Sequence, residues 1–279
     1  MIIRCWGARG SIPVSGKEYD TVGGDTTCLE LRTKQNTVII VDAGTGIRRL
    51  GNRLIQEEAR HYHLLLTHSH WDHLLGFPFF KPIYAQGVRI DVYGCRFAQK
   101  SIEGILSQMM HPPFFPVKLE DVKAELLFHG ACRKPFSIDS MLVTPIRISH
   151  PNQGLGYKFE EDGKTFVFIT DNELTFRHPG GLDYREYLEF SRDTDVLVHD
   201  AEFTEEEYRM TKTWGHSTYR DALCLAIDAG AGRFGLFHHN QDRTDAAVDE
   251  IVKDCRRIVK KRGSRLDVFA MAAGMEIRL

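Results

Sequence analysis

The chain carries His68-Ser69-His70-Trp71-Asp72-His73, which places three imidazoles and one carboxylate within six residues. Directly before it, the apolar run His63–Thr67 reads as a buried strand, so the cluster lies where a strand opens into a loop. Such strand ends commonly carry functional residues. The two histidines spaced one residue apart point the same way on an extended segment and can bind one cation together. The aspartate and the last histidine follow as the loop turns towards a helix, so we expect two adjacent metals rather than one.

The composition predicts one large, soluble domain over residues 1–279. With 279 residues and 42% hydrophobic content, the chain can bury a sizeable core. Apolar runs such as Val38–Val41 are far shorter than the roughly 20 residues of a membrane helix. The opening Met1–Trp6 reads as a first strand rather than as a signal peptide. Six widely spaced cysteines form no CxxC pair and no dense disulfide framework, so we expect a reducing, cytoplasmic location.

The charge pattern gives little reason to expect a nucleic-acid-binding protein. The formal net charge is −2, which provides no global attraction to a phosphate backbone. A basic run at residues 256–262 lies on the expected C-terminal helix and reads as an ordinary solvated face.

Continuous apolar strands alternate with helical stretches, which is typical of an α/β protein whose sheets are covered by helices. The expected strands are Thr37–Asp42, His63–Thr67, Arg89–Tyr93, Met141–Ser149, Asp195–His199, Phe234–Phe237 and Leu266–Ala270. Residues 155–170 read as two strands joined by a tight turn at Asp162-Gly163. The expected helices are Gly46–Arg60, Ser101–Met110, Ser217–Ala229 and Thr244–Arg262, the third with Ser217 as its N-cap.

Three further polar residues end apolar runs later in the chain, namely His150, Asp171 and His238. If their strands are neighbours, the three side chains share one edge of a sheet. Any one of them alone could be an ordinary strand-end residue, whereas together they would complete a binuclear site. Imidazole and carboxylate ligands without thiolate suit Zn²⁺, Mn²⁺ or Fe²⁺. Water activated between two cations would then be the nucleophile, in agreement with a sequence that has no G-x-S-x-G motif.

The opening cluster has the HxHxDH pattern, and through it the chain resembles the metallo-β-lactamase fold superfamily of binuclear metallohydrolases. The resemblance implies a four-layer αβ/βα sandwich, with the site along the edge between two facing sheets. His70 stands where flavodiiron redox relatives have a glutamate, which favours hydrolysis over oxygen chemistry. The signature does not choose among lactamases, thioesterases, lactonases, nucleases and phosphodiesterases.

The resemblance also implies how the ligands divide between two divalent transition metal ions, Zn or Mn/Fe. One metal takes His68, His70 and His150, the other takes Asp72, His73 and His238, and the carboxylate of Asp171 bridges them. Asp72 would also orient the attacking hydroxide, so Asp72 and Asp171 are expected to act in catalysis. His239 competes for the last position; we prefer His238 from the register of the Leu-Phe-His-His ending, which leaves His239 either to support a ligand or to contact the substrate.

A second informative block is Trp214-Gly215-His216-Ser217-Thr218, which is followed by a helix. It resembles the Gly-His-Ser-Thr motif of ribonuclease Z and its phosphodiesterase relatives. The resemblance implies that His216 contacts a phosphate oxygen or protonates the leaving alkoxide, and that the serine and threonine contact the substrate where a helix start favours an anion. The alternative is that the serine only caps the helix. Either Asp200 or Glu202 could orient His216, and the sequence leaves both open.

A closer resemblance covers nearly the whole chain. It is to a bacterial branch of the superfamily, often labelled cyclic-nucleotide phosphodiesterase-like, that begins Trp-Gly-x-Arg-Gly-Ser-Ile-Pro. The matching blocks are Trp6–Pro13, Asp42–Gly46, His70–His73 with Gly76–Phe80, and Phe237–His239. One departure is Asp25, where the branch usually has asparagine; an anion there would repel a phosphate, which argues against substrate contact.

The resulting hypothesis is a phosphodiesterase for small phosphodiesters such as cyclic nucleotides. Its partner would be a small molecule, with no membrane and no long nucleic acid; a homodimer is left open. The main alternative is a ribonuclease Z-like nuclease. Ribonuclease Z grips RNA with a long arm between the positions matching His150 and Asp171, but only twenty residues lie between them here. In a lactone or thioester hydrolase the block at residues 214–218 would have no function. A non-catalytic metal scaffold would not need a full set of ligands.

Residues 95–140 are expected to carry substrate choice. Within them, Pro112-Pro113-Phe114-Phe115-Pro116 forms a stiff aromatic loop. This loop could stack on a base, cover the site or act as a structural plug.

Overall fold

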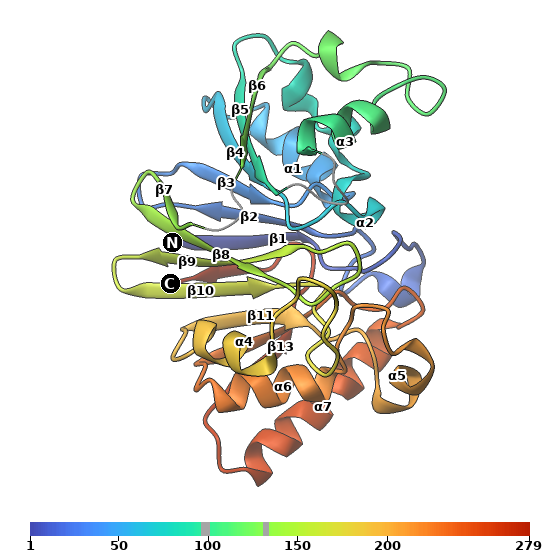
Figure 1. The fold of residues 1–279 in the computed structure, drawn as a ribbon, viewed down its shortest axis with the longest axis vertical. Helices are drawn as coiled ribbons and strands as arrows, with labels where there is room; N and C mark the ends of the chain where they lie inside the picture. Colours follow the sequence, from blue (N-terminus) through green and yellow to red (C-terminus); the bar gives the residue numbers. More distant parts are fainter. Residues whose placement is uncertain (96–100, 131–133) are drawn as a thin grey trace.

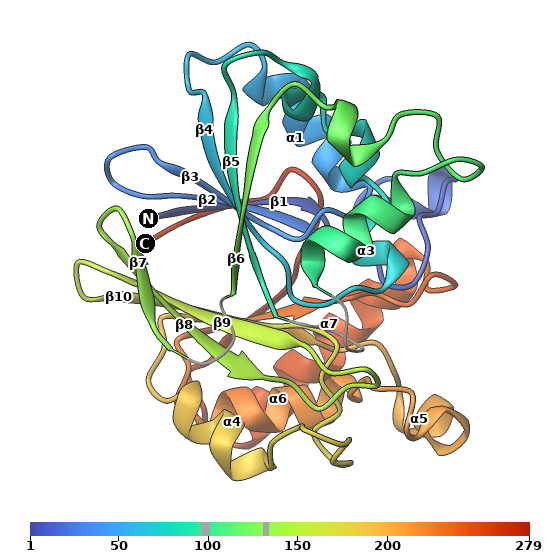
Figure 2. The ribbon, with the colours of Figure 1, turned by 45° about the horizontal axis from the view of Figure 1, so that its top comes forward.

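The computed structural model describes residues 1–95, 101–130 and 134–279 (Figure 1). Within these residues, the strands form two seven-stranded sheets. The sheets face each other, and helices lie on their outer sides, so the layers run helix, sheet, sheet, helix (Figure 2). This is the four-layer αβ/βα sandwich predicted from the sequence. Parts of the segment expected to carry substrate choice, residues 96–100 and 131–133, lie outside the described residues.

The first sheet comes mainly from the N-terminal half of the chain. Its order is β14 (Glu276–Arg278), β1 (Ile2–Gly7), β2 (Cys28–Arg32), β3 (Val38–Val41), β4 (His61–Leu65), β5 (Arg89–Gly94) and β6 (Glu125–Gly130). Strands β3 to β6 run parallel to one another. Helices α1 (Gly46–Leu54) and α3 (Ile102–Met109) pack their apolar residues against one face of this sheet. Short helices span Lys17–Tyr19, Trp71–Leu74 (α2), Phe77–Phe79, Lys81–Tyr84 and Leu119–Asp121.

The second sheet comes from the C-terminal half. Its order is β13 (Asp267–Ala270), β12 (Arg233–Phe237), β11 (Val196–Asp200), β10 (Lys164–Ile169), β9 (Leu155–Glu161), β8 (Met141–Arg147) and β7 (Phe136–Ile138). Strands β10 to β13 are parallel. Its outer face carries α4 (Tyr184–Phe190), α6 (Tyr219–Asp228) and α7 (Asp245–Lys261). Helix α5 (Glu205–Thr211) lies beyond them, near one end of the sheet (Figure 1).

A dry layer of side chains holds the two sheets together. Leu31 and Ile39 of the first sheet share this cluster with Phe159, Phe166 and Phe168 of the second. The rings of Phe159 and Phe166 stack with their centroids 5.8 Å apart. Because burial of one such side chain contributes roughly 1.5–3 kcal/mol relative to exposure, this layer fixes how the ends of the two sheets face each other.

The predicted strands and helices are present, but several boundaries differ and some elements were missed. The helix predicted over residues 46–60 ends at Leu54. Prediction of Ser217 as an N-cap is wrong: α6 begins at Tyr219, and the hydroxyl of Thr218 accepts a hydrogen bond from the Asp221 amide. Strands β2, β6, β7 and β14 and helices α4 and α5 do not follow from the apolar pattern.

Strand β2 illustrates why a pattern of apolar residues can miss a buried strand. Glu30 and Arg32 interrupt its apolar run, yet both are buried. Their side chains pair with each other at 2.5 Å, and Trp6 donates a further hydrogen bond to Glu30. Pairing makes burial of these charges possible, and the sequence gives no direct sign of it.

Two further expectations concern membrane-spanning helices and the redox state of the cysteines. Across the described parts of the chain, no helix has both the length and the apolar character needed to cross a membrane. Cys5, Cys28, Cys224 and Cys255 carry free thiols, whereas Cys95 is disulfide-bonded, which the wide spacing of the cysteines did not predict.

Candidate metal centre

The carboxyl ends of parallel strands from both sheets meet at one edge of the sandwich. Helix α2 follows β4 at this edge (Figure 1). A backbone hydrogen bond of 2.8 Å from the Leu155 amide to the Thr67 carbonyl joins the two sheets here. Polar residues that end β4, β8, β10 and β12 are therefore brought together, although they lie far apart in the sequence.

The signature adopts the local structure predicted for it. His70 is extended, with φ −69° and ψ 156°, and occupies the N-cap position of α2. His68 and His70 therefore leave the strand on an extended segment, whereas Asp72 and His73 lie on the first turn of α2. His68, Asp72 and His73 are buried, and His70 is partly exposed.

Two groups of possible ligands adjoin each other, and each brings its ligand atoms within 4.8 Å of one another. The first group is His68, His70, His150 and Asp171; the second is Asp72, His73, Asp171 and His238. Together they contain all seven residues predicted as metal ligands. The aspartate common to both groups faces rings of each, with Oδ2 3.6 Å from Nε2 of His68 and Oδ1 3.3 Å from Nε2 of His73.

The nitrogen atoms of these rings are arranged as metal ligands require. Nε2 of His68 and Nε2 of His73 are buried and have no hydrogen-bond partner among the described residues. The opposite nitrogens are held by the protein: Nδ1 of His73 donates to Asp42 at 2.8 Å, and Nδ1 of His150 donates to the Gly215 carbonyl at 2.9 Å. Such partners fix the ring orientation and leave Nε2 with a free lone pair. The cluster is thus compatible with a divalent metal site.

Buried charges in the cluster are balanced among its members. Burial would raise the pKa of Asp171, but the rings of His238, His73 and His68 outweigh this and hold that pKa well below its usual range. Burial lowers the pKa of His68 well below its usual value. For His73, burial is outweighed by the surrounding carboxylates, which raise its pKa well above the usual value. A divalent cation bound at Nε2 of His73 would take the place of a proton there and balance the same carboxylates.

Three residues around the cluster have left-handed backbone. Asp42, Asp171 and His238 follow the ends of β3, β10 and β12 with φ of 63°, 51° and 55°. This conformation is uncommon for residues other than glycine and costs of order 1–3 kcal/mol when the surrounding structure imposes it. The turn that it makes directs each side chain back over the strand ends, where the cluster lies.

Gly215 shows how closely the backbone approaches the ligands. Its φ is +98°, and a Cβ at this position would lie 2.1 Å from Nδ1 of His150. The same residue offers its carbonyl to that nitrogen. The glycine of the Trp-Gly-His-Ser-Thr block therefore supports a metal-ligand candidate, in addition to placing His216.

His216 lies against the cluster. Its ring stacks on His238 with the centroids 4.7 Å apart, and its Nδ1 donates to Asp200 at 2.8 Å. Glu202 is 3.4 Å from this nitrogen and accepts a hydrogen bond from His238 instead, so Asp200 is the residue that orients His216. Burial lowers the pKa of His216, but Glu202 and Asp200 outweigh it and raise the pKa to about 9. His216 also lines a cavity of about 470 Å³, so a cationic ring faces this cavity.

Comparison with known proteins agrees with this geometry. Residues 37–239 match the family model described as the Beta-lactamase superfamily domain. The chain belongs to this superfamily. The predicted superfamily and fold are thereby confirmed, and with them the prediction of a metal-dependent hydrolase.

Relatives of this superfamily member are distant but cover it almost completely. A ribonuclease Z from Haloarcula marismortui is 24% identical in an alignment that covers 90% of this chain and 89% of the relative. The metallo-β-lactamase fold protein YhfI from Bacillus subtilis has a TM-score of 0.72 at 16% identity, covering 99% of each chain. A diphosphatase of the PhnP family has a TM-score of 0.69 at 15% identity, covering 100% of this chain and 97% of the other.

The three residues predicted to contact substrate each use a side-chain atom in a hydrogen bond within the protein. Nε2 of His239 donates to the Met271 carbonyl at 2.9 Å, and the ring is buried outside both ligand groups. The hydroxyl of Ser217 donates to the Asn172 carbonyl at 2.6 Å and is buried. Thr218 uses its hydroxyl to cap α6. Internal partners engage these three side chains, and contact of His239, Ser217 and Thr218 with a substrate stays a prediction.

Several residues that support the site in this superfamily member were not predicted. Asp42 holds His73 and also accepts hydrogen bonds from the amide and hydroxyl of Thr67, both at 2.7 Å. The Ser11 amide donates to Asp72 at 2.9 Å, which gives the opening Trp6–Pro13 block a role at the centre. Asp42 and Ser11 both stand in sequence blocks quoted above, but nothing in those blocks shows which side chain or amide they would meet.

A further group, His61, His63 and Asp91, also satisfies the spacing for a metal. It lies on β4 and β5, and it was not predicted. Asp91 already pairs with Arg89 at 3.2 Å and with His129 at 2.6 Å. The guanidinium of Arg89 would repel a cation here, so we assign this group no metal.

Proposed function

We propose that this superfamily member is a phosphodiesterase that hydrolyses small phosphodiesters, such as cyclic nucleotides, with two divalent transition metal ions. The observation that carries the proposal is the placement of His216. Asp200 fixes the ring, which stacks on a ligand candidate and faces a cavity. A cationic ring so placed can bind a phosphate oxygen or protonate a leaving alkoxide. Both tasks arise in phosphodiester cleavage, whereas a thiolate leaving group needs no proton donor.

The seven clustered residues would hold the two ions. His68, His70 and His150 would bind one ion, Asp72, His73 and His238 the other, and Asp171 both. When bound, two such ions lower the pKa of a water between them and polarise the phosphoryl oxygen. Zinc, manganese and iron all accept this set of imidazoles and carboxylates.

The side chains of the protein would perform the remaining steps. Asp72 is held by the Ser11 amide, so its carboxylate has a fixed orientation from which to align the attacking water. His216 would donate the proton of its Nε2 to the leaving oxygen. Asp200 accepts a hydrogen bond from Nδ1 of His216. This fixes the ring so that Nε2 and its proton lie on the side away from Asp200.

A ribonuclease Z-like nuclease is the second candidate. The relative from Haloarcula marismortui favours it, because the likeness spans 90% of this chain. Against it, residues 155–169 between His150 and Asp171 form only the hairpin of β9 and β10, which leaves no space for a long arm. A net charge of −2 also provides no electrostatic anchor for long RNA.

Substrate preference should separate these two candidates. We expect the enzyme loaded with Mn²⁺ or Zn²⁺ to hydrolyse bis(p-nitrophenyl) phosphate, and to cleave cyclic nucleotides faster than transfer RNA with a 3′ trailer. A chain with few clustered cations gains little from additional phosphates, so the measured rates should depend weakly on salt. Efficient removal of the trailer with steep salt dependence would favour the nuclease. Cleavage of a lactone or thioester, but of no phosphodiester, would overturn both.

Metal content provides an independent check. We expect elemental analysis of protein purified without chelator to give two transition metal ions per chain, because the two ligand groups share only one residue. A His150→Ala variant should lose one of them, since it removes a ligand from the first group only. One ion per chain in the unmodified protein would contradict the binuclear assignment.

A further inference from the structure

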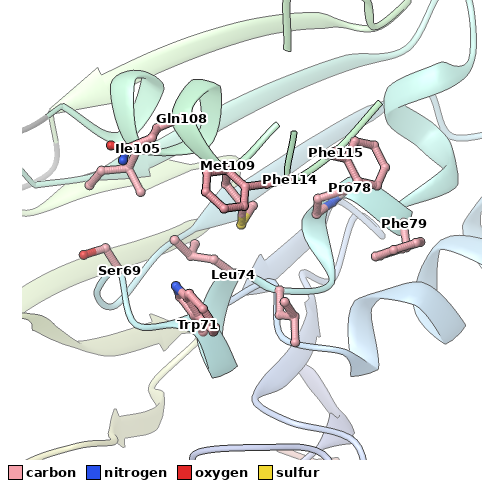
Figure 3. Close-up of a pocket in the computed structure, with 11 residues that line it drawn as sticks. Ser69, Trp71, Leu74, Pro78, Phe79, Ile105, Gln108, Met109, Phe114 and Phe115 are labelled. Atoms are coloured by element: carbon pink, nitrogen blue, oxygen red, sulfur yellow. The ribbon is translucent and has the colours of Figure 1, made fainter. Parts of the chain in front are cut away.

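An apolar cavity of about 520 Å³ opens beside the metal-ligand signature. We define it by its lining residues, which are Ser69, Trp71, Leu74, Leu75, Pro78, Phe79, Ile105, Gln108, Met109, Phe114 and Phe115. Figure 3 shows that they come from two segments: α2 with the residues just before and after it, and α3 with the aromatic loop that follows. This loop was predicted to stack on a base, cover the site or plug the structure, and two of its phenylalanines line the cavity.

The apolar cavity adjoins the metal-ligand cluster along the chain, although no ligand candidate is among its described lining residues. Its lining residues Ser69 and Trp71 alternate along the chain with the ligand candidates His70 and Asp72. Among the seven ligand candidates, all of which the structure describes, His70 is the one that is not buried. The cluster is therefore open to solvent beside Ser69 and Trp71. A substrate held on the cluster can extend from there into the apolar cavity.

The lining determines what chemical group can enter. None of the described lining residues carries a charge, and all except Ser69 and Gln108 are apolar. A second phosphate would lose its hydration there without gaining a partner, so the occupant must be neutral. Trp71 is 79% exposed and Phe114 is 81% exposed, which leaves two large rings without full cover. Exposed rings of this kind offer stacking surface for a planar group.

The cavity that carries His216 has a different character. It is lined by Glu202, Glu207 and Asp242 as well as by Trp214 and His216. The leaving oxygen must meet His216 if that ring supplies its proton. In a diester with two separate ester groups, the group that stays on the phosphate is then left to the apolar cavity; in a cyclic nucleotide, whose ribose carries both ester oxygens, only the base is left to it.

Resting on the proposed function, we propose that the apolar cavity binds a neutral, planar ring carried by the ester group that remains on the phosphate. The ring stacks against Trp71 and Phe114 while the phosphate lies on the metal cluster. The substrate class is thereby narrowed to small phosphodiesters with an aryl group or a nucleobase on the retained side. A substrate that places a second phosphate in this cavity is disfavoured, because no described lining residue carries a charge to pair with it.

The test compares three p-nitrophenyl phosphodiesters that share one leaving group. Their retained ester is methyl, phenyl or 1-naphthyl. We expect kcat/KM to rise roughly 10- to 100-fold from methyl to naphthyl, because the larger ring buries more apolar surface. Trp71→Ala and Phe114→Ala should each remove most of this preference. Leu142→Ala, which removes an exposed apolar side chain on β8 outside this cavity, should keep the ratio.

A second measurement distinguishes failure of this inference from failure of the proposed function. Calorimetry compares binding of naphthylphosphonate and methylphosphonate, which cannot be hydrolysed, to the metal-loaded protein. If no diester is cleaved but naphthylphosphonate binds at least about tenfold tighter, and Phe114→Ala removes the difference, the phosphodiesterase proposal fails and the cavity assignment stands. If all three diesters are cleaved equally and neither variant changes the ratio, the cavity assignment is wrong and the phosphodiesterase proposal stands. Trp71 neighbours two ligand candidates, so Trp71→Ala could also lose metal. In that case the result for Phe114→Ala alone decides between the two readings.

Discussion

Replacement of Asp72 by alanine should lower kcat/KM for bis(p-nitrophenyl) phosphate by on the order of 10³-fold or more. Asp72 belongs to the second ligand group, and its Oδ2 lies 3.2 Å from Nε2 of His73 and 3.0 Å from Nε2 of His238. The change removes a metal ligand and the carboxylate that aligns the attacking water. Several kcal/mol of transition-state stabilisation should disappear with them. Activity is measured together with metal content, which should fall in the same variant.

Asp200→Ala is the matched control, because it removes a buried aspartate at the same sheet edge that is not in either ligand group. Its effect acts through the orientation of His216, and we expect a loss of about 10- to 100-fold with both metals retained. Equal losses in the two variants, with unchanged metal content in Asp72→Ala, would show that Asp72 is not a ligand.

Replacement of His216 by alanine should reduce kcat by roughly 10²- to 10⁴-fold while both metals and the fold are retained. The ring lies beside the ligand cluster, and Nδ1 is engaged by Asp200. Its contribution is therefore expected in the chemical step. Measurement of kcat, metal content and the circular dichroism spectrum on one preparation checks all three parts of this expectation.

The leaving group reveals which task His216 performs. A proton donor matters most for a poor leaving group, so the loss in His216→Ala should be larger for an alkoxide than for p-nitrophenolate. A residue that only contacts the phosphate would give the same loss for both. Loss of metal would instead assign His216 as a ligand, an assignment for which the spacing of Glu202, His216 and His238 leaves room.

The ligand candidates could be predicted because their positions depend on local patterns. The signature lies within six residues. A strand end followed by one helical turn is enough to direct its first two histidines to one ligand group and its last two residues to the other. His150, Asp171 and His238 each follow an apolar run, and parallel strands bring their carboxyl ends to the same edge. The residue that ends each strand therefore follows from short-range information, whereas the neighbourhood of the strands was an expectation carried by the resemblance.

The substrate side of the centre could not be predicted in this way. Whether a hydroxyl or ring is free depends on partners far along the chain, such as the Met271 carbonyl for His239 and the Asn172 carbonyl for Ser217. The apolar cavity likewise requires two segments to meet, residues 69–79 and 105–115. No pattern within either segment shows that the other lies opposite.

The division of the ligands between two sheets also sets the order in which the centre can assemble. Residues 68–73 emerge early in synthesis, whereas His238 follows only after β12 has been made. A partial set can bind a cation weakly, but full coordination requires both halves of the chain to have packed against each other. Bringing ligands so far apart in the sequence together has an entropic cost of loop closure. Folding of the chain has already overcome this cost, so a metal ion should bind the folded chain in preference to the unfolded one. If the centre binds its metals as proposed, metal supply should influence how much of the chain is folded, as well as how much of it is active.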